Sequence, residues 1–170
     1  MTLTEAKVLI NCDRLSTSHS QAWFDLGCGS GLFSEALIEL LSKGSFVYAI
    51  DQEPTSFRSN QIKFRQLDFV KDPLPDVLVD GILMANSLHY VKDKIPFLSK
   101  IKKHLKPGGV VLLVEYDMVT PNQWVPYPIS FLSAQDLFKH VGLEFVYKIS
   151  ERPSTFNNGK IYSALFQNQN

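Results

Sequence analysis

The chain has 170 residues, 45% of them hydrophobic, and its 17 Lys and Arg residues balance its 17 Asp and Glu residues to a formal net charge of zero. This size fits one domain with its own core over residues 1–170, and the neutral charge argues against attraction to phosphate backbones, so we expect no nucleic-acid partner. No run reaches the roughly 20 apolar residues of a membrane-spanning helix and no signal-peptide pattern opens the chain, so we expect no membrane association and a cytoplasmic location.

The first 21 residues predict a short helix followed by a polar loop. Thr2 and Glu5 stand at the spacing of a capping box, which predicts a helix within residues 2–12. The chain holds two cysteines, Cys12 and Cys28. They are too few for a disulfide framework or a metal site with spaced ligands, so we expect no bound metal.

A glycine-rich segment follows the first predicted strand, residues 23–26. Glycines stand at positions 27, 29 and 31, and apolar residues then recur at helical spacing over 32–41. Backbone N–H groups in such a loop can approach a ligand at the helix N-terminus, so we expect a small molecule there; the alternative is an ordinary glycine-rich turn. The dinucleotide fingerprint would need a third glycine at position 32, which is Leu, and this argues against a nicotinamide-dependent oxidoreductase.

Alternating strands and helices are predicted along the rest of the chain. The segment 52–67 contains Pro54 and little helical periodicity, so its crossover helix is expected to be reduced to a turn or two. The basic run at 100–106 is interpreted as the solvated face of a helix rather than a nucleic-acid patch. The turn signal Asn157-Asn158-Gly159 predicts an antiparallel hairpin. The predicted strands are 46–50, 62–67, 77–85, 110–114, 143–149 and 161–166, and the predicted helices are 94–106 and 133–141.

Two consecutive predicted strands end at carboxylates. Asp51 follows the second strand, and Asp68, with Phe69 after it, follows the third. The carboxyl ends of parallel strands line the ligand crevice in a doubly wound sheet, and a carboxylate there can accept hydrogen bonds from ribose hydroxyls. The alternative for Asp51 is an N-cap of a following helix.

Taken in order, the segment 25–31, Asp51, the pair Asp68-Phe69, the segment 80–90 and the segment 105–109 resemble the class I, Rossmann-like methyltransferases of the type 11/25 kind, which use S-adenosyl-L-methionine. The resemblance implies an α/β, doubly wound three-layer sandwich whose seven-stranded sheet is mostly parallel with a C-terminal antiparallel hairpin. It divides the single domain into an N-terminal helix and loop (1–21), a cofactor-binding half (22–117) and a substrate-side loop, helix and hairpin (118–170).

The resemblance also implies cofactor contacts. Residues of the glycine loop would hold the methionine portion, with Cys28 as a small filler rather than a nucleophile. The carboxylates would pair with the cations and donors of the cofactor. The implied cofactor-binding residues are Asp25, Gly27, Cys28, Gly29 and Gly31 at the methionine portion, Asp51 and Gln52 at the ribose, Asp68 and Phe69 at the adenine, and Asn86 at the methionine amine.

The acceptor side is less defined by the sequence. His89 and Tyr90 are the catalytic candidates, since a histidine suits proton abstraction near neutral pH, although a structural role for His89 is an alternative and a base is needed only if the nucleophile must lose a proton. Tyr116, Trp124 and Tyr127 are the candidates for a substrate wall, with core or surface packing as the alternative.

The resulting expectation is an enzyme that moves a methyl group from S-adenosylmethionine to O, N or C of a small molecule by in-line displacement. The alternative is a methyltransferase-like module that binds the cofactor or a partner without catalysis. The short segments before residue 23 and between Asp51 and Asp68 leave three options: a site that admits a large acceptor, a site closed by homodimer formation, or a loss of activity.

Overall fold

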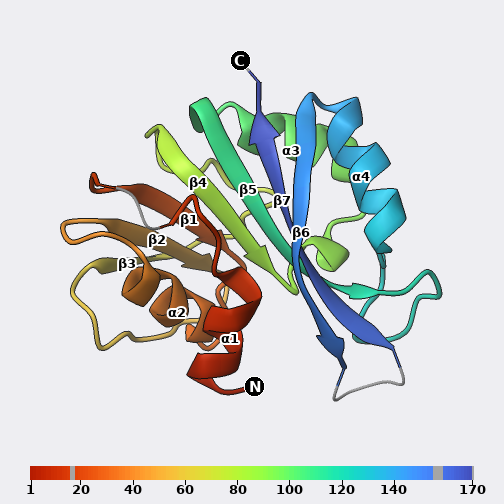
Figure 1. Ribbon diagram of the computed structural model, residues 1–170, viewed down its shortest axis with the longest axis horizontal. Coiled ribbons are helices and arrows are strands. Elements are labelled where there is room, and N and C mark those ends of the chain that lie inside the picture. The colour runs from red at the N-terminus through yellow and green to blue at the C-terminus, as the bar shows by residue number, and fades with distance from the viewer. Residues whose placement is uncertain (16–17, 155–158, 170) are drawn as a thin grey trace.

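The structure is a computed structural model and describes residues 1–15, 18–154 and 159–169. Within these residues the chain forms a seven-stranded sheet in the order β3-β2-β1-β4-β5-β7-β6 (Figure 1). β1 to β5 run parallel, and β7 is antiparallel to both β5 and β6. The strands are β1 (Ala22–Leu26), β2 (Phe46–Asp51), β3 (Ile62–Gln66), β4 (Val79–Ala85), β5 (Leu105–Asp117), β6 (Leu143–Pro153) and β7 (Lys160–Asn168). The predicted fold class is confirmed.

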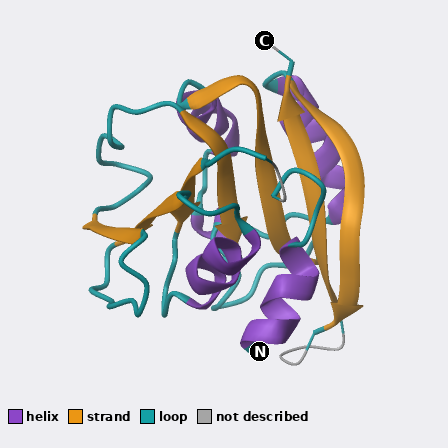
Figure 2. Ribbon diagram, turned by 60° about the vertical axis from the view of Figure 1, so that its left-hand side comes forward, coloured by secondary structure: helices purple, strands orange, loops and turns teal. Residues whose placement is uncertain are grey.

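Helices cover both faces of this sheet (Figure 2). α1 (Leu3–Ile10) and α2 (Leu32–Leu40) pack on one face, and α3 (Lys94–Lys102) and α4 (Phe131–His140) pack on the other. A short 3-10 helix, η1 (Leu88–Tyr90), follows β4. The predicted capping box starts α1: the Glu5 N–H donates to Thr2 Oγ1 (3.2 Å), and the Thr2 N–H donates to Glu5 Oε2 (2.7 Å). None of the helices in the described part of the chain is long and apolar enough to cross a membrane.

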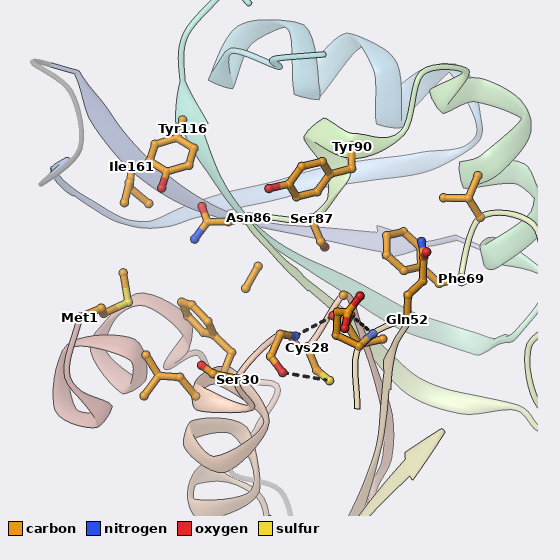
Figure 3. A pocket seen from close by; sticks show the side chains of 18 of the residues that line it. Met1, Cys28, Ser30, Gln52, Phe69, Asn86, Ser87, Tyr90, Tyr116 and Ile161 are labelled. Carbon is orange, nitrogen blue, oxygen red and sulfur yellow. Dashed lines mark hydrogen bonds between the residues drawn. The ribbon is translucent and has the colours of Figure 1, made fainter. Parts of the chain in front are cut away.

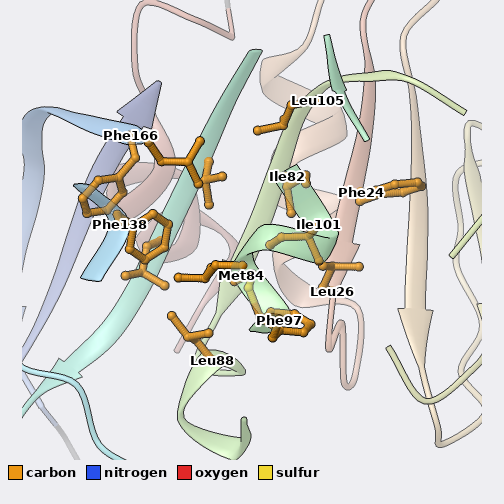
Figure 4. Close-up of a cluster of buried hydrophobic side chains, with 14 of the residues drawn as sticks. Phe24, Leu26, Ile82, Met84, Leu88, Phe97, Ile101, Leu105, Phe138 and Phe166 are labelled. Atoms are coloured by element: carbon orange, nitrogen blue, oxygen red, sulfur yellow. The ribbon is translucent and has the colours of Figure 1, made fainter. Parts of the chain in front are cut away.

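Alternation along the central strands supplies two separate cores. Trp23 belongs to the cluster under α1 and α2, and its neighbour Phe24 belongs to the cluster under α3 and α4. In the second cluster, Phe138 of α4 stacks on Phe166 of β7 with ring centroids 4.0 Å apart (Figure 4). Burial of each such side chain contributes about 1.5–3 kcal/mol, so both helix layers are fixed to the sheet.

Three predicted boundaries were wrong. The helix predicted over 94–106 ends at Lys102, because Leu105 pairs with Val79 and so belongs to β5. The helix predicted from 133 begins at Phe131, because Ser130 caps it by accepting the Ser133 N–H. The crossover between β2 and β3 contains no helix over 52–61, where a turn or two was expected. Of the predicted hairpin turn, Asn157 and Asn158 lie outside the described residues.

The topology brings distant parts of the sequence to one edge of the sheet. The carboxyl ends of β1, β2, β4 and β5 meet there, as expected for parallel strands. Because β7 runs antiparallel to β5, with Ile161 opposite Tyr116, the start of β7 and the end of β6 lie at the same edge. This edge carries the candidate site.

Candidate functional site

A cavity of about 1060 Å³ opens at the carboxyl edge of the sheet (Figure 3). It brings together residues from β1, β2, β4, β5, both strands of the hairpin and α1, which are separated by up to the whole length of the chain. The predicted site residues that line it are Gly27, Cys28, Gly29, Asp51, Gln52, Asp68, Phe69, Asn86, Tyr90, Tyr116 and Tyr127.

The glycine loop depends on left-handed backbone. Gly27 has φ +79° and Gly31 has φ +86°, and a Cβ atom at Gly31 would lie 2.4 Å from the Phe57 ring. Gly29, with φ +51°, has no atom within 4 Å of the position where its Cβ would stand. The backbone of the loop at Gly29 therefore faces open space, and only glycine fits at Gly31 without a shift of Phe57.

Asp51 connects the end of β2 to this loop. Its Oδ2 atom accepts the Gly29 N–H (2.8 Å), and its Oδ1 atom accepts the Glu53 N–H (3.0 Å). Because no helix follows β2, the N-cap interpretation of Asp51 is wrong, and the carboxylate lies on the cavity wall. Each carboxylate oxygen has a second lone pair that can accept a ligand hydroxyl.

Asp68 holds the turn that follows β3. Its Oδ1 atom accepts the N–H groups of Val70 (3.0 Å) and Lys71 (3.2 Å), and its Oδ2 atom lies 3.0 Å from Lys71 Nζ. Desolvation alone would raise the pKa of Asp68, but these hydrogen bonds outweigh it and lower the pKa below its ordinary value. The carboxylate is thus engaged largely with its own turn, while the neighbouring Phe69 presents its ring to the cavity.

Lys100 of α3 secures the same turn from behind. Its Nζ atom donates to the carbonyl oxygens of Phe69 (3.4 Å), Val70 (3.0 Å) and Asp72 (2.7 Å). An ammonium group offers three donors, and all three find a carbonyl on this turn. The position of Phe69 on the cavity wall therefore depends on a helix residue that the sequence did not single out.

Asn86 combines two features that are uncommon in a folded protein. It is the non-glycine residue with positive φ (+56°) among those described, a conformation that costs roughly 1–2 kcal/mol. Its Oδ1 atom is buried and has no hydrogen-bond partner, although its backbone N–H donates to Val114 O (2.8 Å). A buried acceptor left unpaired costs about 1–3 kcal/mol. Both features occur on the cavity wall (Figure 3).

Asp25 and Gly31 were predicted as cofactor contacts, but neither lines the cavity. Strand alternation turns Asp25 toward α2, where Ser34 Oγ donates to its Oδ2 atom (2.5 Å) and its Oδ1 atom has no partner. Burial raises the pKa of Asp25 to about 7, the Ser34 hydrogen bond opposes this shift, and the Asp51 charge adds to it. Asp25 thus lies beneath the loop rather than on its ligand side.

His89 and Trp124 also lie outside the cavity lining. His89 is buried, and its Nδ1 atom lies 2.8 Å from Oε2 of the buried Glu115, whose Oε1 atom accepts the His89 backbone N–H (3.1 Å). An ionised carboxylate only accepts, so Nδ1 carries the hydrogen. Trp124 is 70% exposed on the loop after β5. The structure brings Tyr90, which follows His89, and Tyr127, whose N–H donates to His89 O (3.0 Å), to the wall instead.

Several lining residues were not predicted. Arg152 and Ile161 come from the hairpin, Glu5 comes from α1, and Lys92 follows η1. Arg152 Nη2 lies 3.0 Å from Glu5 Oε1, which ties the end of β6 to α1. The predicted hairpin was the signal that could have found Arg152 and Ile161, because its open end had to fall beside the carboxyl end of β5.

The two cysteines do not form a reactive centre. Both are free thiols and both are buried. Burial, together with the charges of Asp25 and Asp51, raises the pKa of the Cys28 thiol, so it stays protonated on the cavity wall and acts as a small filler. Across the described residues, no group of three or more His, Cys, Asp and Glu side chains could hold a metal ion.

Comparison with known proteins places this geometry. A sequence profile described as "Methyltransferase domain" matches residues 24–113, which is more than half of the chain. An uncharacterized methyltransferase of Mycobacterium tuberculosis is 27% identical over 110 residues, covering 61% of this chain and 53% of that protein. The chain spans about half the length of the curated relatives it matches.

Solved structures share the fold at low sequence identity. The 1,6-didemethyltoxoflavin-N1-methyltransferase of Burkholderia thailandensis, bound to its substrate and S-adenosylhomocysteine, superimposes with a TM-score of 0.78 at 15% identity and covers 99% of this chain and 78% of that chain. The N-methyltransferase NodS of Bradyrhizobium japonicum, in complex with S-adenosylhomocysteine, gives a TM-score of 0.74 at 18% identity, with 99% and 86% covered.

Proposed function

The chain belongs to the family of methyltransferase domains, and from that premise we propose that it transfers a methyl group from S-adenosylmethionine to a small-molecule acceptor. When bound, this cofactor supplies a methyl carbon on a positively charged sulfur, which an acceptor takes by in-line displacement. The structures related in fold were solved with the demethylated form of the same cofactor, and this supports its assignment here.

The buried and unpaired Oδ1 atom of Asn86 is the observation that carries the proposal. An acceptor of this kind calls for a donor from a ligand, and the ammonium group of a methionine portion is such a donor. Asn86 lines the same cavity as Gly29, whose backbone faces open space. We therefore assign the methionine portion to the region between Asn86 and the glycine loop.

The rest of the wall fits the remaining parts of the cofactor. Asp51 has lone pairs for two ribose hydroxyls and is held in place by the Gly29 and Glu53 N–H groups. Gln52 lies beside it on the wall, and the Phe69 ring offers an apolar face to an adenine. Asp68 spends its carboxylate on its own turn, so its contribution is to hold Phe69 in place more than to bind the adenine amine.

Neither Asp25 nor Gly31 touches the ligand in this proposal. Asp25 supports the loop through Ser34 of α2, and Gly31 allows the chain to turn past Phe57 into that helix. The protein's own contribution to methyl transfer is to orient the two reactants within one cavity, since the cofactor carries the reactive group.

The proposal is tested by incubating the protein with S-adenosylmethionine labelled on its methyl group and a panel of small phenols, amines, thiols and carbon acids. We expect label in an organic product with the wild-type chain and loss of it with Asp51→Ala. Cofactor binding without transfer to any member of a broad panel would favour the second candidate, a cofactor-binding partner subunit. No binding and no transfer would refute both.

A further inference from the structure

We propose, on the basis of the function proposed above, that the methyl acceptor is a planar small molecule whose nucleophilic oxygen is already ionised when it enters the cavity, such as an acidic phenol or enol. The chain supplies hydrogen-bond donors and positive charge to this oxygen and no general base. The inference rests on which side chains line the far end of the cavity and on what each of them can do with a proton.

The far end of the cavity is separate from the cofactor contacts. The cofactor residues follow β1 to β4, whereas the remaining wall comes from η1, β5 and the hairpin. We call this part the acceptor wall and define it by Tyr90, Lys92, Tyr116, Tyr127 and Arg152. Three of its five members are flat aromatic rings, which favour a planar ligand.

The acceptor wall donates hydrogen bonds that no protein group receives. Within the described residues, neither the Tyr90 nor the Tyr116 hydroxyl has a hydrogen-bond partner, and Lys92 has no ion-pair partner. Figure 3 shows the Tyr90 and Tyr116 hydroxyls directed toward the space above Asn86. An oxygen with several lone pairs and a negative charge satisfies these donors, and hydrogen bonds to charged oxygens are the stronger kind.

No group on the acceptor wall is suited to remove a proton near neutral pH. Burial, with the charge of Glu115 and the neighbouring Tyr90, raises the pKa of the Tyr116 phenol, which therefore stays protonated and donates. Glu5, beside the wall, has its pKa lowered by the Thr2 backbone hydrogen bond and by Arg152, which makes it a weaker base. Lys92 and Arg152 are cations and offer only donors.

His89 is the remaining candidate, and the structure gives it a different task. Its ring is buried against Glu115, and it does not line the cavity. The Glu115 carboxylate receives both the ring and the backbone N–H of His89, and the His89 carbonyl receives the Tyr127 N–H. The pair therefore fixes η1 against β5 and positions the acceptor wall, in which Tyr90 and Tyr127 are neighbours of His89.

With an ionised acceptor the transfer balances without a base. The acceptor oxygen forms a bond to the methyl carbon as the carbon–sulfur bond breaks, and both electrons of the broken bond stay on sulfur. The negative charge of the acceptor and the positive charge of the sulfur cancel, so no proton is released or taken up. A neutral alcohol would leave a proton for which the acceptor wall has no recipient.

The test is the pH dependence of kcat/KM for acceptors that share a shape and differ in acidity: 4-nitrophenol, 4-cyanophenol, phenol and 4-hydroxycoumarin, with 4-nitroaniline as the matched amine. We expect the apparent pKa of kcat/KM to follow the pKa of each phenol or enol. We also expect Tyr116→Phe to lower kcat/KM about tenfold, as for one lost hydrogen bond to a charged group. Tyr147→Phe, which alters a tyrosine outside the cavity, should change it little.

Three outcomes would overturn the inference: an inflection at one fixed pH for every acceptor that disappears in His89→Gln, methylation of the amine alone, or methylation of none of these compounds. Binding of S-adenosylhomocysteine is measured on the same protein. A chain that binds the cofactor and gives one of these outcomes refutes only the ionised acceptor, whereas a chain that does not bind the cofactor refutes the proposed function itself.

Discussion

Asn86 shows at the scale of one residue how a functional contact can oppose stability. Its positive φ and its unpaired buried Oδ1 atom are both unfavourable in the ligand-free protein. Glycine accepts this backbone conformation without strain and has no Oδ1 atom. Replacing Asn86 by glycine therefore separates the ligand contact from the backbone shape.

We predict that Asn86→Gly leaves the free energy of unfolding unchanged or raises it, and weakens binding of S-adenosylhomocysteine by at least about tenfold, the effect of one lost hydrogen bond to a charged donor. Chemical denaturation measures the first quantity and calorimetry the second. Asn60→Gly, an exposed position outside the cavity, is the matched control. Equal affinity of Asn86→Gly and wild type would show that the carboxamide does not touch the ligand.

Asp25 makes stability depend on pH. Its pKa is about 7 in the folded protein, against 3.8 for the ordinary group, because it is buried. Between these values the folded chain binds more protons than the unfolded chain, so this group makes the free energy of unfolding fall as pH rises, by at most about 1.4 kcal/mol per pH unit. Above pH 7 the effect levels off.

We expect the stability of Asp25→Asn relative to wild type to increase from pH 5 to pH 7, since the amide carries no charge to desolvate. Urea unfolding of both proteins at pH 5, 6, 7 and 8 measures the difference. A constant difference across this range would mean that Asp25 titrates below pH 5 in the folded state, despite its burial.

At the scale of elements, the glycine loop and the crossover after β2 depend on each other. The crossover has no helix, and Phe57 from it packs where a Cβ atom at Gly31 would stand, at 2.4 Å. Gly29 has left-handed backbone as well but open space beside it. Alanine at either position meets the left-handed cost of about 1–2 kcal/mol, and only Gly31→Ala adds a steric clash of roughly 1–3 kcal/mol.

Thermal unfolding should accordingly place the Tm of Gly31→Ala below that of Gly29→Ala. The double variant Gly31→Ala with Phe57→Ala removes the ring that causes the clash, and it should lose less stability than the sum of its two single variants. Additive losses would show that Phe57 and Gly31 are not in contact.

The turn after β3 depends on α3 through Lys100. We predict that Lys100→Met, which removes three hydrogen bonds to carbonyl oxygens, lowers the free energy of unfolding by about 1–3 kcal/mol and speeds amide exchange over 69–72. Lys103→Met, an exposed lysine at the end of the same helix, should do neither. Hydrogen exchange followed by mass spectrometry compares the two; equal protection of the turn in both variants would contradict the prediction.

Local signals predicted the elements that depend on local chemistry. The capping box at Thr2, the glycine loop and the carboxylate after β2 are each determined within a few residues, and the structure shows all three. The end of α3 was missed, because Leu105 is drawn into the sheet by Val79, 26 positions earlier. Propensity cannot anticipate a pairing of that range.

Side-chain direction was the other limit of the sequence. Asp25 and His89 are one and two bonds of chain away from cavity-lining segments, yet each faces inward, toward Ser34 and toward Glu115 respectively. Their partners lie 9 and 26 positions away in the sequence. Arg152 could be placed only once the hairpin was known to end beside β5. Type of residue and position on a strand therefore predicted the neighbourhood of the site better than the contacts within it.

At the scale of the whole molecule, the sheet order divides one cavity into two ends. β1, β2 and the turn after β3 supply the carboxylate, the glycine loop and Phe69, whereas β5, η1 and the hairpin supply tyrosines and cations. Asn86, at the end of the central β4, lies between them. Ligand binding at the carboxyl edge of an open α/β sheet follows the same arrangement in general. The account of the molecule thus depends first on whether the cofactor end binds its ligand.

Calorimetric titration with S-adenosylhomocysteine tests that claim most directly. We predict saturable binding by the wild-type chain at one site, binding weakened about tenfold or more in Asp51→Asn, and unchanged binding in Asp76→Asn, an exposed carboxylate outside the cavity. Saturable binding weakened only in Asp51→Asn would support both the ligand and its place. No binding by the wild-type chain at high micromolar ligand, or equal binding by wild type and Asp51→Asn, would contradict the account.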